Sequence, residues 1–208
     1  MHINKSLICC SILAGGLSSR MGGGIKSFNK FNNERIFDRI LKNISTQVNQ
    51  IVINTNRNNE FDEYKLTIIN DIIKGHLGPL AGIHASLNWI NKNLPHVNWL
   101  LSIPSDTPFL PKNLAERLYL KAINNNKKIV LATSNNRTHP VIGLWHCDLV
   151  KDLEKSLRNK IRKIIFFAEK HSLGKENFKN SNFDPFFNIN FKEDIIKAQE
   201  IENNYLKK

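Results

Sequence analysis

The strongest signal in this chain is the segment Leu13-Ala14-Gly15-Gly16-Leu17-Ser18-Ser19-Arg20-Met21-Gly22-Gly23-Gly24-Ile25-Lys26. It follows the apolar run 7–13, which predicts a buried strand ending at glycines. Its five glycines let the backbone approach phosphates closely, with amide N–H groups turned inward. Arg20 and Lys26 supply positive charge for a triphosphate. The segment therefore predicts a phosphate-binding loop, and this is favoured over a flexible glycine loop with two surface bases.

Two common phosphate-binding motifs do not match this loop. A Walker A loop ends in Gly-Lys-Ser/Thr, whereas Ile25 precedes Lys26 here. A Gly-x-Gly-x-x-Gly fingerprint fails as well, because Ser27 stands where the last glycine belongs. Ordinary P-loop and dinucleotide-binding functions are therefore disfavoured.

Outward from the loop, strand-like apolar runs alternate with helical patterns. The predicted strands are 7–13, 50–54, 66–69, 99–103, 128–133, 140–146 and 186–189. The predicted helices are 36–44, 80–90, 114–123, 149–157, 164–171 and 191–201, and 177–184 is predicted to be a loop. This alternation predicts a Rossmann-like, three-layer α/β fold with a mostly parallel central sheet. No linker divides the chain, so residues 1–208 are predicted to form one domain.

Distinctive polar residues follow the predicted strands, at Gly15, Asn54, Asp71 and Asp106. In open α/β sheets, ligands bind beyond the carboxyl ends of the strands. We expect these residues to meet at one edge of the sheet. Asp106, stiffened by prolines on both sides, is the preferred Mg²⁺ ligand, although an Asp that caps a turn remains a serious alternative.

Several other residues give weaker signals. Gly78 begins Gly78-Pro79-Leu80-Ala81-Gly82, whose amides could receive a base or a phosphate, but ordinary helix initiation is favoured there. His139 is balanced between a ligand contact and a loop histidine held by its proline neighbour. For Asn190, a helix cap before Phe191 is the safer interpretation than a ligand contact.

Composition limits the function classes. The formal net charge is +12, but the basic residues are scattered and form no recognised nucleic-acid motif, so small polyanions are favoured over nucleic acid as partners. No stretch is long enough to cross a bilayer, and the first strand lacks a signal-peptide layout, so a cytoplasmic protein without a membrane partner is expected. The three cysteines are expected to be buried and reduced.

Taken together, these motifs resemble the molybdenum cofactor guanylyltransferase (MobA) family within the nucleotidyltransferases. The matching positions are Leu13 to Gly16, Arg20 to Gly23, Lys26, Asn54, Asp71 with the Gly-Pro-Leu-Ala-Gly segment, Asp106-Thr107-Pro108, His139-Pro140, Asn188 and Asn190. The loop motif is shared with other sugar and alditol nucleotidyltransferases, whereas the full ordered set is more specific. The match runs from Leu13 to the closing helix.

The resemblance implies transfer of GMP from GTP to the phosphate of molybdenum-molybdopterin, with release of pyrophosphate. It implies a nucleotide-binding half at about residues 1–135, a pterin-binding half at about residues 136–208, and Mg²⁺ held by Asp106. The implied catalytic residues are Arg20, Lys26 and Asp106. The implied GTP-binding residues are Leu13, Ala14, Gly15, Lys26, Asn54, Asp71, Gly78 and Asp106, and the implied pterin-binding residues are His139, Arg162, Asn188 and Asn190. Hand-off to molybdoenzymes or their chaperones is implied as well.

One position departs from the family pattern. The family usually carries Asp directly before the signature lysine, and this chain has Ile25. Three alternatives to the guanylyltransferase function stay open: a nucleotidyltransferase using CTP or a sugar phosphate, a non-catalytic nucleotide-binding homologue, and, on charge alone, a nucleic-acid-binding protein.

Overall fold

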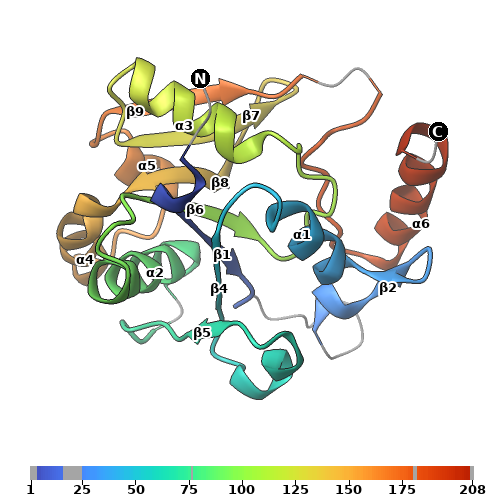
Figure 1. The fold of residues 1–208 in the computed structure, drawn as a ribbon, viewed down its shortest axis with the longest axis horizontal. Coiled ribbons are helices and arrows are strands. Elements are labelled where there is room, and N and C mark those ends of the chain that lie inside the picture. Colours follow the sequence, from blue (N-terminus) through green and yellow to red (C-terminus); the bar gives the residue numbers. More distant parts are fainter. Residues whose placement is uncertain (1–3, 16–24, 76, 180–181, 207–208) are drawn as a thin grey trace.

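A seven-stranded sheet in the order β5-β4-β1-β6-β8-β7-β9 forms the centre of this computed structural model (Figure 1), which describes residues 4–15, 25–75, 77–179 and 182–206. Its strands are β1 (Ile8–Leu13), β4 (Gln50–Asn54), β5 (Thr67–Ile69), β6 (Trp99–Pro104), β7 (Ile129–Ser134), β8 (Arg137–His146) and β9 (Leu173–Asn177). Strand β8 runs antiparallel to β6 and β7, and the other pairings are parallel. The prediction of a mostly parallel sheet is confirmed.

Helices cover both faces of this sheet. They are α1 (Ile36–Ile44), α2 (Pro79–Asn93), α3 (Leu114–Asn124), α4 (Val150–Arg158), α5 (Ile164–Ala168) and α6 (Lys192–Ile201). Helical turns add Lys5–Leu7, Lys26–Phe28, Asn58–Tyr64, Cys147–Leu149 and Glu202–Leu206. Helices α1 and α3 pack in one apolar cluster, and α2, α4 and α5 pack in the other. Figure 1 shows α2 beside α4, and α6 beside β2 at the right of the view.

The strand pattern explains this two-sided core. Side chains alternate between faces along a strand, so Cys10 joins the α1 and α3 cluster while Cys9 joins the cluster of α2. All three cysteines are free and buried, and burial raises the pKa of Cys9 and of Cys147 to about 12. The thiols act as small apolar side chains, as the sequence predicted.

The last third of the chain differs from the sequence prediction. Residues 186–189 form no strand, because the backbone N–H of Phe187 donates to the Asp184 carbonyl in a turn, at 3.0 Å. Strand β9, which the sequence analysis missed, is an edge strand of mostly polar residues in which Gly174 is the buried position. A second missed feature is the hairpin β2 (Lys30–Phe31) and β3 (Glu34–Arg35), turned by Asn32 and Asn33 at positive φ.

The connections create a switch point beside β1. After β1 the chain passes through α1 to β4, which pairs with one edge of β1. After β5 it passes through α2 to β6, which pairs with the opposite edge of β1. The carboxyl ends of β1 and β6 therefore border a crevice, which is where ligands bind in sheets of this kind. The two predicted halves share the sheet, since β8 lies between β6 and β7. None of the described helices is long and apolar enough to cross a membrane.

Candidate active site

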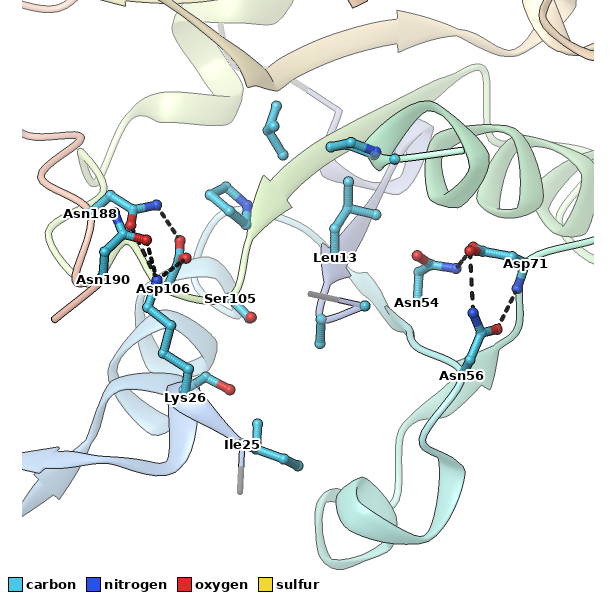
Figure 2. A pocket seen from close by; sticks show the side chains of 17 residues that line it. Leu13, Ile25, Lys26, Asn54, Asn56, Asp71, Ser105, Asp106, Asn188 and Asn190 are labelled. Atoms are coloured by element: carbon cyan, nitrogen blue, oxygen red, sulfur yellow. Dashed lines mark hydrogen bonds and ion pairs between the residues drawn. The ribbon is translucent and has the colours of Figure 1, made fainter. Parts of the chain in front are cut away.

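A cavity of about 530 Å³ opens at the carboxyl ends of β1, β4 and β6 (Figure 2). Most of the predicted site residues line it: Leu13, Ala14, Gly15, Lys26, Asn54, Asp71, Gly78, Asp106, Asn188 and Asn190. Arg20 belongs to the segment 16–24, which lies outside the described residues. His139 and Arg162 are not among the residues that line the cavity, and Arg162 is exposed between α4 and α5.

One side of the cavity is built around the ammonium group of Lys26. Its Nζ lies 2.7 Å from Asp106 Oδ2, 2.6 Å from Asn190 Oδ1 and 3.4 Å from Asn188 Oδ1. The Lys26 and Asp106 side chains are 18% and 21% exposed, so the ion pair is partly shielded from water. Four polar side chains from three distant parts of the sequence thus converge on one point (Figure 2).

Backbone contacts bring the two asparagines to this point. The backbone N–H of Ile189 donates to the carbonyl oxygen of Asp106 at 3.0 Å, and the Ile189 side chain is buried. Asn188 Nδ2 donates to Asp106 Oδ1 at 2.5 Å. The predicted helix cap at Asn190 is wrong, because Asp194 accepts the backbone N–H groups of Asn190 and Phe191, which leaves the Asn190 side chain for Lys26.

The opposite side of the cavity holds a carboxylate framed by two amides. Asp71 Oδ1 accepts a hydrogen bond from Asn54 Nδ2 at 3.0 Å, and Asp71 Oδ2 accepts one from Asn56 Nδ2 at 3.3 Å. The backbone N–H of Asp71 returns a bond to Asn56 Oδ1. Leu13 lies between this group and the Lys26 group (Figure 2). Asn56 was not among the predicted site residues, although its place after β4 was a usable signal.

The Gly-Pro-Leu-Ala-Gly segment contributes in two ways. Gly78 is the N-cap of α2, with a φ of 74° that favours glycine, so the prediction of helix initiation in this segment is confirmed, and the helix begins at Pro79, one residue before the predicted start. Gly82 has a different role, which the sequence analysis missed. A Cβ at Gly82 would lie 2.1 Å from Asn54 Oδ1, so only glycine lets α2 approach the Asn54 side chain, which is 4% exposed.

The oxygen-rich set around Asp106 fits a divalent cation of the Mg²⁺ type. Asp106 is a carboxylate, and Asn188 and Asn190 place their amide oxygens around Lys26 Nζ beside it, all hard ligands suited to Mg²⁺. The described residues contain no cluster of three or more His, Cys, Asp or Glu side chains able to hold a metal by themselves. Phosphate oxygens of a substrate would have to complete the coordination, as is usual for Mg²⁺.

Two further residues complete the wall beside Lys26. Ser27 is 1% exposed, and within the described part of the chain its Oγ has no hydrogen-bond partner. Ile25 also lines the cavity while packing against the core cluster of α1, so the residue that departs from the family pattern presents an apolar surface there.

Comparison with known proteins identifies relatives over nearly the whole chain. Residues 10–173 match the family described as the MobA-like NTP transferase domain. A molybdenum cofactor guanylyltransferase of Nitrobacter hamburgensis is 38% identical over 91% of this chain and 92% of its own. One of Brucella ovis is 36% identical over 96% and 94%.

Among solved structures, the molybdopterin-guanine dinucleotide biosynthesis protein A of Archaeoglobus fulgidus has a similar fold. Its TM-score is 0.74 at 22% identity, and the match covers 93% of this chain and 98% of that one. The Rossmann-like arrangement predicted from the sequence is therefore found in a solved protein of similar length.

Proposed function

The chain belongs to the MobA-like NTP transferase family, and from that premise we propose that it transfers GMP from GTP to molybdenum-molybdopterin. The observation that carries the proposal is the cavity with two differently built sides. The Lys26 and Asp106 group suits the phosphates, and the Asp71 group suits a nucleobase. Relatives named for this activity support the choice of GTP and of the pterin acceptor.

The proposed reaction is a displacement at the α-phosphorus of GTP. An oxygen of the molybdopterin phosphate forms a new bond to the α-phosphorus, while the bond from that phosphorus to the bridging α–β oxygen breaks. The bonding electrons leave with pyrophosphate, and the product is the guanine dinucleotide form of the cofactor. The attacking phosphate is already ionised, so no general base is needed. Catalysis of this type rests on alignment and charge neutralisation.

In this proposal the triphosphate lies along the glycine loop. Gly15 lines the cavity directly after β1, and Lys26 supplies a positive charge from the far end of the loop. Arg20 is assigned to the triphosphate from its place in the sequence motif. Lys26 exchanges its contacts with Asp106, Asn188 and Asn190 for phosphate oxygens when the nucleotide binds.

We assign guanine recognition to Asp71. A carboxylate with two acceptor oxygens suits the guanine edge, which presents a ring N–H and an amino group side by side. Asn54 and Asn56 hold the Asp71 carboxylate in place through its two oxygens. Gly78 and Pro79, at the start of α2, line the cavity together with this group, so the positive end of the helix dipole lies beside the proposed nucleotide site.

Asp106 is assigned to Mg²⁺, with substrate oxygens completing the coordination. The ion would supply charge stabilisation for the departing pyrophosphate. For Asp106 to reach a metal, the Lys26 ammonium must leave its Oδ2, and an incoming triphosphate gives Lys26 another anionic partner. Nucleotide binding and metal binding are therefore expected to support each other.

The acceptor is assigned to the side formed by Asn188 and Asn190, whose amides both donate and accept hydrogen bonds as a pterin requires. No direct contact is assigned to His139 or Arg162, because the cavity wall does not include them. We further propose that the product passes to molybdoenzymes or their chaperones, and that the reaction takes place in the cytoplasm.

Thermal unfolding with GTP, ATP, CTP and UTP, each with and without Mg²⁺, tests the nucleotide assignment. A ligand at 100 times its Kd stabilises the native state by about 2.7 kcal/mol. A rise in Tm confined to GTP and enhanced by Mg²⁺ supports the proposal. A preference for CTP would replace it with a cytidylyltransferase function on the same fold.

A further inference from the structure

Ser134, His139 and Asp184 form a hydrogen-bonded cluster beyond the cavity. Ser134 ends β7, His139 lies in β8, and Asp184 follows β9. Ser134 Oγ lies 2.7 Å from His139 Nε2 and 2.7 Å from Asp184 Oδ1. The Ser134 residue is 1% exposed, so its hydroxyl must be satisfied within the protein.

A shift in the pairing register of β7 and β8 places His139 beside Ser134. Leu131 pairs with Gly143, but the next residue, Ala132, pairs with His139, so β8 carries extra residues around Pro140. The turn between β7 and β8 consists of Asn135 and Asn136, both at positive φ. The ring of His139 packs against Phe186, with 4.7 Å between centroids.

The positions of the protons follow from the geometry. A hydroxyl has one proton, and an ionised carboxylate can only accept, so the Ser134 hydroxyl donates to Asp184. His139 Nε2 must then carry a hydrogen and donate to Ser134 Oγ. This order is the reverse of that in a nucleophilic triad, where the histidine accepts the serine proton. The cluster is thus built to hold Asp184, and the buried serine is not set up to attack a substrate.

Asp184 begins the segment that reaches the active site, residues 184–190, which we call the acceptor arm. Its Oδ1 accepts the backbone N–H of Phe186 at 2.9 Å, and its carbonyl accepts that of Phe187 at 3.0 Å. Further along, the N–H of Ile189 donates to the Asp106 carbonyl. The arm is therefore fixed at its start by the cluster and at its end by the active-site loop.

We propose that Ser134, His139 and Asp184 are positioning residues that set where the acceptor arm places Asn188 and Asn190. Both asparagines direct their oxygens to Lys26, and Asn188 also contacts Asp106, so their position depends on the path of the backbone from Asp184. Their assignment to the acceptor rests on the proposed function. The cluster acts through the arm and does not touch the substrate.

The matched pair Asp184→Ala and Asp184→Asn tests the structural part. Asparagine keeps an oxygen for the Ser134 hydroxyl and the Phe186 N–H, whereas alanine removes it. Hydrogen–deuterium exchange at the amides of residues 186–190 is expected to quicken about tenfold or more in Asp184→Ala and to stay near wild type in Asp184→Asn. Peptides from β1 and β4 serve as the internal control and should exchange at unchanged rates.

Steady-state kinetics test the functional part. In Asp184→Ala, kcat/KM for the molybdopterin acceptor should fall about tenfold to a hundredfold, since small misplacements of a binding group cost that much. The Kd for GTP should stay within about threefold of wild type, because Asp71, Asn54 and Lys26 are unchanged. Asp184→Asn should recover most of the acceptor kcat/KM.

A second pair covers the case in which Asp184→Ala does not fold. His139→Gln keeps an N–H donor for Ser134, and His139→Leu removes it, so only the leucine variant should speed exchange in the arm. Unchanged exchange in the alanine or leucine variant, or equal defects in both members of a pair, would overturn the proposal. If wild-type protein made no dinucleotide, the proposed function would fail while the exchange experiment would still decide the role of the cluster.

Discussion

Lys26 Nζ lies 2.7 Å from Asp106 Oδ2, although 79 residues separate the two in the chain. Without a nucleotide, each charge is the other's partner. A triphosphate is a more highly charged partner for Lys26, and a divalent cation is one for Asp106. This pair therefore links the helical turn Lys26–Phe28 to the loop after β6. Four predictions concern residues in or next to the cavity that this pair borders.

Lys26→Ala is expected to weaken GTP binding by about 10- to 100-fold, because one charge-assisted contact contributes about 1.5–3 kcal/mol. Isothermal titration calorimetry with GTP and Mg²⁺ measures the change. Lys30→Ala is the matched control, since Lys30 is exposed on β2 and does not line the cavity. GTP affinity equal to that of the control would remove Lys26 from the site.

Asp106→Asn should keep the acceptor oxygen that Asn188 uses but lose the carboxylate charge. We expect turnover to fall by about 10²-fold or more, with Tm close to wild type, since charge stabilisation in a site of this kind is a large term. Pyrophosphate release measured across a Mg²⁺ titration reports the effect. Near-normal turnover at any Mg²⁺ concentration would contradict the metal assignment.

Gly82→Ala should displace the Asn54 side chain, because the new Cβ would lie 2.1 Å from Asn54 Oδ1. We expect a loss of about 1–3 kcal/mol in the free energy of unfolding, as is typical of overpacking, together with weaker GTP binding. Denaturant unfolding of Gly82→Ala in wild-type and Asn54→Ala backgrounds isolates the clash. The loss of unfolding free energy caused by Gly82→Ala should be smaller in the Asn54→Ala background, and an equal loss in both backgrounds would contradict the clash.

Asp71→Asn should reduce the preference for GTP over CTP, because it replaces one acceptor oxygen by a donor amide. A bidentate hydrogen-bond pair to a base edge is worth about 1–3 kcal/mol of discrimination, or about 10- to 100-fold in the ratio of kcat/KM values. Turnover with both nucleotides gives the ratio. An unchanged ratio would place base recognition elsewhere in the cavity.

Burial of His84 is expected to make the protein less stable at acidic pH. The residue is 2% exposed, and among the described residues its Nδ1 has no hydrogen-bond partner. Burial lowers the pKa of His84 below the usual value of about 6.5, despite nearby Glu154. The unfolded state then binds more protons than the native state below about pH 6.5, so stability falls as pH drops through that range. Above about pH 6.5 His84 is neutral in both states, so it no longer makes stability depend on pH.

The matching variant is His84→Leu, which cannot titrate. Its Tm should fall less than that of wild type between pH 7.5 and pH 5.5. Parallel pH profiles for the two proteins would show that burial of His84 does not contribute. Burial lowers the pKa of His139 as well, so some acid sensitivity is expected to remain in His84→Leu.

The sequence predicted the layers and most of the cavity wall, for a physical reason. Parallel strands gather their carboxyl ends at one edge, so Gly15, Asn54 and Asp106 had to lie near each other once the strands were recognised. It did not predict the acceptor arm or β9. Strand β9 is short and mostly polar, and the arm mixes buried apolar residues such as Ile189 with polar ones in no helical or strand period. Contacts with distant residues such as Ser134 fix the path of the arm.

Gly82 shows the same limit at a single residue. From sequence, it reads as part of an ordinary helix start. The structure gives it a role through a close approach to Asn54, a contact across 28 positions that no local pattern contains. Ser134 was likewise invisible as a partner of His139 and Asp184, because a buried serine in a strand has no distinctive spacing.

The most direct test of the guanylyltransferase assignment is product formation. Purified protein is incubated with Mg²⁺, molybdenum-molybdopterin and an equimolar mixture of GTP and CTP, and the products are identified by mass spectrometry. We expect the guanine dinucleotide cofactor with stoichiometric pyrophosphate, and no product without Mg²⁺. Formation of the cytosine dinucleotide, or of no dinucleotide at all from protein that binds GTP, would contradict it.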